Sequence, residues 1–130
     1  MGFLDRVKQE LFRYEGLHFE GSDGGIDIAP ASPSGFSLRI EGGEGSFLVS
    51  YEAWHEHFDS EDEALRCLNF GLSSDCRLKV VKRSGRAYRW TVEVQEDGEW
   101  QGFSTTGLIF FPFWRPRSTV YLSNAFSHRE

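Results

Sequence analysis

Apolar side chains recur at helical spacing in two stretches of the chain, and each stretch predicts an amphipathic helix. The first helix is expected to run for about three turns and to end at Gly16. The second begins after Ser60, which together with Glu63 can form a capping box, and Gly71 is expected to end it. The apolar positions are Phe3, Leu4, Val7, Leu11 and Tyr14 in the first helix and Ala64, Leu65, Leu68 and Leu72 in the second.

Elsewhere apolar and polar residues alternate, which predicts strands with one buried face. Residues 36–41 and 47–51 form a predicted hairpin around a glycine-rich turn, and residues 20–35 are expected to be a loop with a brief strand at 26–28. Further strands are predicted at 76–81, 88–95, 108–111 and 118–123. Asp97 and Gly98 predict one more tight turn, which leads into Trp100 and Phe103.

Consecutive hairpins predict a mainly antiparallel, meander-like sheet. We therefore expect an α+β fold of about five to six strands with the element order α-β-β-α-β-β-β-β and both helices on one face of the sheet. The 130 residues are expected to form a single domain, 1–130. The apolar content of 39% and aromatic content of 15% argue against disorder.

The segment from Trp54 to Phe58 does not fit a strand that runs unbroken from residue 47. Strict alternation would turn His55 and His57 inward and leave the two aromatic rings outside. A β-bulge near residues 52–53 would reverse this arrangement. We favour the bulge, which buries the rings and exposes the histidines.

His55 and His57 are the candidate metal ligands. Side chains two apart on a strand point the same way, about 6.5–7 Å apart, so one divalent transition metal such as zinc or manganese can bridge them. No third nitrogen or sulfur ligand has motif spacing, and the following helix N-terminus disfavours a cation. A pair of surface histidines without any cofactor is the commoner alternative.

Charge is sorted into blocks along the chain. Residues 40–65 contain eight acidic and no basic residues, whereas residues 76–90 contain six basic and no acidic ones. Such sorting predicts opposed surface potentials that orient a partner or a second copy of the chain. The basic patch comprises Arg77, Lys79, Lys82, Arg83, Arg86 and Arg89.

Within the basic patch, Arg77, Lys79 and Arg89 are expected on the solvent side of neighbouring strands. The alternative interpretation is that the patch is an ordinary solvated surface that binds no partner. Nucleic acid is not an expected partner, because the net charge is -6. Tyr88 and Trp90 are also expected on the opposite, buried face, where they cannot stack on bases.

The longest apolar run, residues 108–114, is far short of the roughly 20 residues of a membrane-spanning helix, so no membrane association is expected. Pro112 cannot donate to a strand ladder, which places Phe113 and Trp114 at or beyond a sheet edge. With Arg115 and Arg117, these rings have the composition of a protein-interaction hot spot. Rings that fold back over the core are the alternative.

The function expected from the sequence is that of a small, non-enzymatic protein-interaction module that uses the surface at residues 113–117 and can self-associate. The alternative is a small metal-assisted enzyme or metal-binding protein centred on His55 and His57. A carrier with a ligand pocket between helices and sheet is a third interpretation. Without a signal peptide, a soluble cytoplasmic protein with reduced Cys67 and Cys76 is expected, a disulfide between the two being the alternative.

Overall fold

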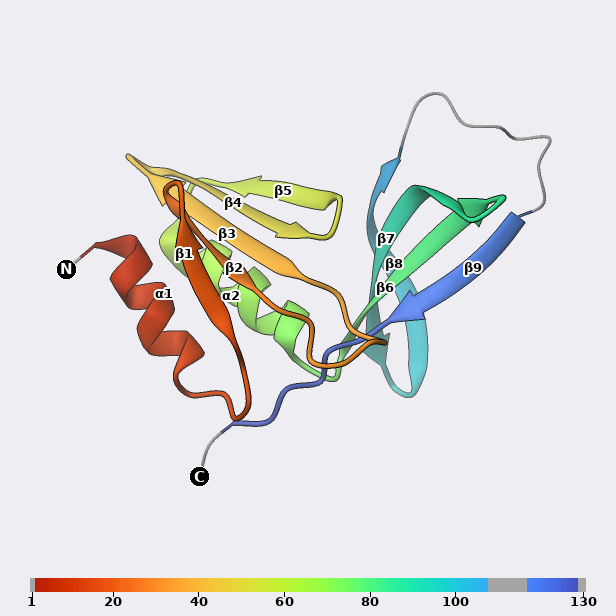
Figure 1. Ribbon diagram of the computed structural model, residues 1–130, viewed down its shortest axis with the longest axis horizontal. Helices are drawn as coiled ribbons and strands as arrows, with labels where there is room; N and C mark the ends of the chain where they lie inside the picture. Colours follow the sequence, from red (N-terminus) through yellow and green to blue (C-terminus); the bar gives the residue numbers. More distant parts are fainter. Residues whose placement is uncertain (1, 108–116, 129–130) are drawn as a thin grey trace.

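The computed structural model describes residues 2–107 and 117–128, which form two helices and nine strands (Figure 1). In chain order, the elements are α1 (Phe3–Leu11), β1 (Phe19–Ser22), β2 (Gly25–Ile28), β3 (Leu38–Gly43), β4 (Ser46–Tyr51), β5 (Trp54–Phe58), α2 (Glu61–Leu72), β6 (Cys76–Arg83), β7 (Arg86–Glu96), β8 (Glu99–Gly107) and β9 (Arg117–Leu122).

The predicted α+β class with antiparallel strands is confirmed, but the strands are divided between two sheets. The first sheet has five strands in the order β1-β2-β3-β4-β5, and the second has four in the order β8-β7-β6-β9. Helix α2 interrupts the meander between β5 and β6, so the chain leaves the first sheet and starts another. The observed element order is therefore α-β-β-β-β-β-α-β-β-β-β.

The additional strands of the first sheet come from two tight turns. Asp23 and Gly24 adopt φ values of 41° and 76°, and they close a β1–β2 hairpin inside the predicted loop. Glu52, with φ of 53°, begins the turn that separates β4 from β5. The orientation predicted for Trp54 and the histidines is correct, but a hairpin turn produces it and not a bulge.

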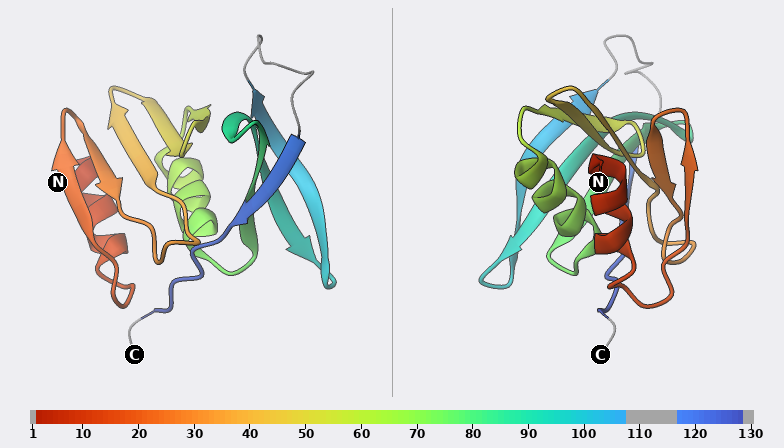
Figure 2. Two further views of the ribbon diagram at one scale, coloured as in Figure 1. Left: turned by 45° about the vertical axis from the view of Figure 1, so that its right-hand side comes forward. Right: turned by 90° about the vertical axis from the view of Figure 1, so that its left-hand side faces the viewer.

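Both helices lie on the same face of the five-stranded sheet, and α2 also contacts β6 of the second sheet (Figure 2). One cluster of buried side chains continues from α1 through the first sheet and α2 to the second sheet. It includes Val7 on α1, Ile40 and Val49 on the first sheet, Leu68 on α2 and Leu78 on β6. Burial of this cluster supplies the main driving force for folding.

Helix α2 begins where the sequence predicts and ends beyond the predicted stop. Ser60 is its N-cap, and the Ser60 hydroxyl accepts a hydrogen bond from the Glu63 N–H at 3.4 Å. Gly71 lies inside the helix, and Ser73 forms the C-cap through two hydrogen bonds to the Phe70 carbonyl. Glycine is required at this position because the helix packs closely on Tyr51: a Cβ on Gly71 would lie 2.6 Å from the Tyr51 ring.

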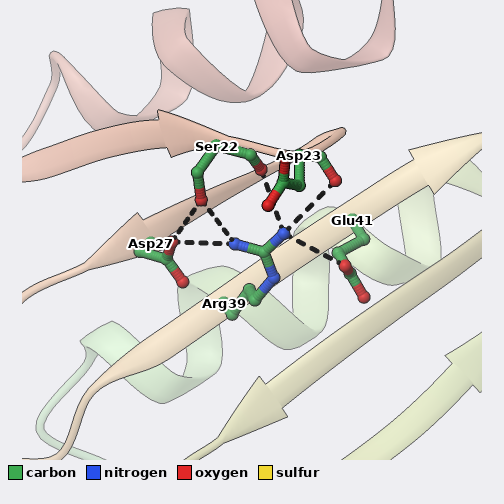
Figure 3. Close-up of polar contacts among 5 residues, drawn as sticks. All are labelled: Ser22, Asp23, Asp27, Arg39 and Glu41. Carbon is green, nitrogen blue, oxygen red and sulfur yellow. Dashed lines mark hydrogen bonds and ion pairs between the residues drawn. The ribbon is translucent and has the colours of Figure 1, made fainter.

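The solvent-facing side of the five-stranded sheet is tied together by Arg39 on β3 (Figure 3). Its guanidinium donates to the carboxylates of Asp27 and Glu41 at 2.8 and 3.1 Å, and to the Ser22 carbonyl at 3.0 Å. A longer contact reaches the Asp23 carbonyl. The hydrogen bond from Arg39 lowers the pKa of Asp27, so this carboxylate stays ionised at neutral pH.

The two sheets are joined by the segment that follows β9. The buried Asn124 side chain accepts hydrogen bonds from the N–H groups of Ala31 and Phe36, each at 3.1 Å, and donates to the Phe36 carbonyl at 2.9 Å. Further along the segment, the Phe126 N–H donates to the Leu72 carbonyl at the end of α2. The segment after the second sheet is thus fastened to the loop before β3 and to α2.

Replacement of Asn124 by Ala is expected to destabilise the protein by about 2–4 kcal/mol, because it leaves buried backbone groups of Phe36 without partners. Urea unfolding followed by circular dichroism measures this change. The control Gln101→Ala alters an exposed residue of β8 and should stay within about 0.5 kcal/mol of the parent. Equal midpoints for the two variants would contradict the role of Asn124.

Replacement of Gly71 by Ala is expected to cost about 1–2 kcal/mol, although alanine is the better helix former. The added methyl group meets the Tyr51 ring and the Leu38 side chain, and both are fully packed. The matched control is Gly43→Ala, which has no heavy atom within 4 Å of its Cβ. If Gly71→Ala raised the urea midpoint, close packing would not be the reason for glycine there.

Candidate functional site

An apolar pocket with a volume of about 420 Å³ opens between α2, β5 and the inner face of the four-stranded sheet, that is, the face turned toward α2. This volume lies in the range of sites that hold a small apolar group. The pocket is lined by the apolar or aromatic residues Tyr51, Trp54, Phe58, Cys67, Phe70, Val92, Val94 and Phe103 and by the charged residues Glu56, Glu63, Arg66 and Glu96.

The inner wall of the pocket is held by ring packing and hydrogen bonds. Trp54 is 1% exposed, its ring lies 4.6 Å from that of Tyr51, and its indole N–H donates to the Ser104 hydroxyl at 3.1 Å. The Tyr51 hydroxyl donates to the Cys67 carbonyl on α2. The wall therefore connects β4, β5, α2 and β8, and its rings are held in place before anything binds.

The mouth of the pocket is formed by Phe103, which a β-bulge aims away from the regular pattern of β8. Val92 pairs with Ser104 and Glu93 pairs with Gly102, so Phe103 is the extra residue between them. The Phe103 side chain is 67% exposed. Since β8 is the outer strand of its sheet, the ring stands at an accessible edge.

Cys67 on the pocket wall is a free thiol without nucleophilic character. Its pKa is raised to about 11, mainly by burial and in part by the negative charge of Glu56, against a lowering contribution from the Tyr51 hydrogen bond. The thiol is therefore protonated at neutral pH. Cys76 is also a free, buried thiol, and burial raises its pKa strongly as well.

His55 and His57 lie side by side on the solvent face of β5, away from the pocket. Their ring centroids are 6.5 Å apart, and the Nδ1–H of His55 donates to the Ala53 carbonyl at 3.1 Å. Among residues 2–107 and 117–128, no group of three or more His, Cys, Asp or Glu side chains is gathered as a metal would require. The metal site stays a prediction with two available ligands.

The basic patch occupies the β6–β7 hairpin. Arg77, Lys79 and Arg89 share the outer face of the four-stranded sheet, and the other three members lie around the turn at residues 84–85. Tyr88 is buried and Trp90 is partly buried, but the patch does contact aromatic rings. Arg83 and Arg89 lie over the ring of Tyr88, and two further rings come from strands β8 and β9.

The two rings from β8 and β9 enclose Arg77, whose guanidinium carbon lies 4.4 Å from the ring of Trp100 and 4.1 Å from the ring of Tyr121. Its Nε donates to the carboxylate of Glu93 at 2.6 Å. Arg77 therefore binds one side chain from each of the other three strands of the sheet and is neutralised by one of them. This arrangement stabilises the sheet and leaves less positive charge for a partner.

The predicted interaction surface lies mostly outside the described residues. Phe113, Trp114 and Arg115 belong to that part of the chain, so their proposed role stays a prediction. Arg117 is the first residue of β9 and is exposed. No helix within the described residues is long and apolar enough to cross a membrane.

No protein-family model, curated protein or solved structure matches this chain. The pocket was not predicted residue by residue, because its walls come from segments that are distant in sequence. The only local signal was the spacing of Trp54 and Phe58, which turns both rings to the same side of β5.

The histidine pair is expected to bind zinc weakly, with a dissociation constant above about 10 µM, because two ligands do not complete a tetrahedral site. Native mass spectrometry of the tag-free protein, with and without a chelator, tests this expectation. The same spectra also test whether the chain forms dimers. A chelator-sensitive zinc adduct of one ion per chain that His55→Ala and His57→Ala together abolish would instead support the metal alternative.

Proposed function

We propose that this protein is a non-enzymatic interaction module that takes an apolar group of a partner protein into the pocket between α2 and the four-stranded sheet. The observation that carries the proposal is a preformed aromatic pocket with an exposed ring, Phe103, at its mouth. Exposed aromatic side chains beside a rigid apolar pocket are typical of the energetic centre of a protein interface.

The position of Phe103 supports this proposal on physical grounds. Exposure of a phenylalanine ring to water is unfavourable by up to about 2 kcal/mol relative to burial. β-bulges that re-aim a side chain occur preferentially near functional sites, and the bulge at Phe103 lies on an outer strand. A partner group that packs between Phe103 and the pocket wall would remove the ring from water.

A cytoplasmic location is part of the proposal. Both cysteines are free; Cys76 is buried in the core, and Cys67 is partly buried on the pocket wall. Self-association through the surface at residues 113–117, as predicted from the sequence, is a separate property that does not depend on the pocket.

The neutral alcohol phenylbutanol serves as a probe of the pocket, because it carries an aromatic ring without charge. We expect millimolar binding in NMR titrations, with amide shifts concentrated in α2, β5 and β8. Replacement of Phe103 by Ala should weaken binding about fivefold, since roughly 1 kcal/mol of contact is lost. The free energy of unfolding of the Phe103→Ala variant should differ from that of the parent by less than about 0.5 kcal/mol, as is usual for substitutions at exposed positions.

The matched control for this experiment is Phe12→Ala. Phe12 is 63% exposed, close to the 67% of Phe103, but it lies next to α1 and does not line the pocket. Its variant should bind phenylbutanol like the parent. Equal weakening in both variants, or amide shifts spread over the whole molecule, would refute the pocket as the binding site.

A further inference from the structure

The charged residues of the pocket define what kind of group it can accept. Its rim has three carboxylates, Glu56, Glu63 and Glu96, and one guanidinium, Arg66. The three carboxylates come from β5, α2 and β7, so they surround the opening and do not follow one element. None of them is part of an ion pair among the described residues.

The positive charges near the rim do not cancel the carboxylates. The positive charge of Arg66 acts on Asp62, one helical turn earlier, as well as on the rim, because it helps to lower the pKa of Asp62. The N-terminus of α2 adds about half a positive charge close to Glu63. With three negative charges against about one and a half positive ones, the opening is negative on balance.

The neighbouring acids of the same helix turn are already neutralised elsewhere. Glu61 and Asp62 receive hydrogen bonds from Arg6 on α1 at 3.0 and 2.6 Å. Helix α2 thus presents paired acids toward α1 and an unpaired one, Glu63, toward the pocket. The charge of Glu56 is felt inside the pocket, where it contributes to the raised pKa of Cys67.

The edge of the four-stranded sheet favours a polypeptide as the occupant. Within the described part of the chain, β8 has a strand neighbour only at β7. Its other side offers backbone groups to an extended segment, which a small molecule would not use. Phe103 on the same strand lies at the pocket mouth, so a segment along β8 can place a side chain in the pocket.

We infer that the partner is a basic segment of another protein, in which an apolar side chain enters the pocket and adjacent lysine or arginine residues face Glu56, Glu63 and Glu96. This inference rests on the proposed function and adds the charge of the partner to it. Apolar contact supplies the affinity, and the carboxylates exclude acidic segments through repulsion.

The test uses three short capped peptides, each with a central phenylalanine. The residues on both sides of this phenylalanine are lysine in the first peptide, serine in the second and glutamate in the third. We expect binding in the order lysine, serine, glutamate, with at least about a tenfold difference between the first and the last in NMR titrations. The difference should shrink between about 0.05 M and about 0.5 M salt, because ions screen exposed charges.

A matched pair of triple variants assigns the preference to the pocket. Glu56→Gln, Glu63→Gln and Glu96→Gln together should bring the three peptides to within about twofold of one another. The control Glu15→Gln, Glu20→Gln and Glu44→Gln removes the same net charge at exposed positions away from the pocket and should keep the preference. If the pocket variant kept the preference for the lysine peptide and the control variant lost it, the inference would be overturned.

Other outcomes separate this inference from the proposed function. Equal binding of all three peptides to the parent protein overturns the charge preference and leaves the pocket as an interaction site. Binding of phenylbutanol without binding of any peptide overturns a protein segment as the occupant. If neither the alcohol nor a peptide binds, both the inference and the proposed function are wrong.

Discussion

The buried amide of Asn124 is the polar constraint that, together with the shared core, holds the two sheets in their relative position. It satisfies three backbone groups in the loop before β3, although it belongs to the segment that follows β9. Because buried amides without partners are costly, only one placement of this segment satisfies both sides. The pocket lies between α2, β5 and the second sheet, where the indole N–H of Trp54 also links the two sheets through Ser104.

The elements that could be predicted are those specified by local signals. The Ser60 cap, the apolar stripe of α2 and the alternation of β6 and β7 each lie within a dozen residues. Of the β1–β2 hairpin, the brief strand at residues 26–28 was predicted, but β1 was missed because its segment has the glycine- and proline-rich composition of a loop, although Asp23 and Gly24 form a recognised turn signal. The prediction of one sheet instead of two has a different cause, since nothing local shows that α2 separates the sheets.

The candidate site could be predicted only in part, for a related reason. The sequence indicated that Trp54 is buried and that the histidines are exposed, and both statements describe one strand. The pocket itself joins residues 51–70 to residues 92–103, and the contact between Trp54 and Ser104 has no local signature. The charge blocks were visible in sequence, but Arg77 is largely neutralised by Glu93.

The Asn124 contacts also bear on how the chain reaches its native state. The amide lies 88 residues along the chain from Phe36, whereas each neighbouring strand pair in the first sheet is linked by a short connection. Closure of such a long loop is entropically unfavourable, and contacts of this kind slow folding. The hairpins of the first sheet can therefore form before the distant segment docks, and the Asn124 contact closes a long loop of the fold.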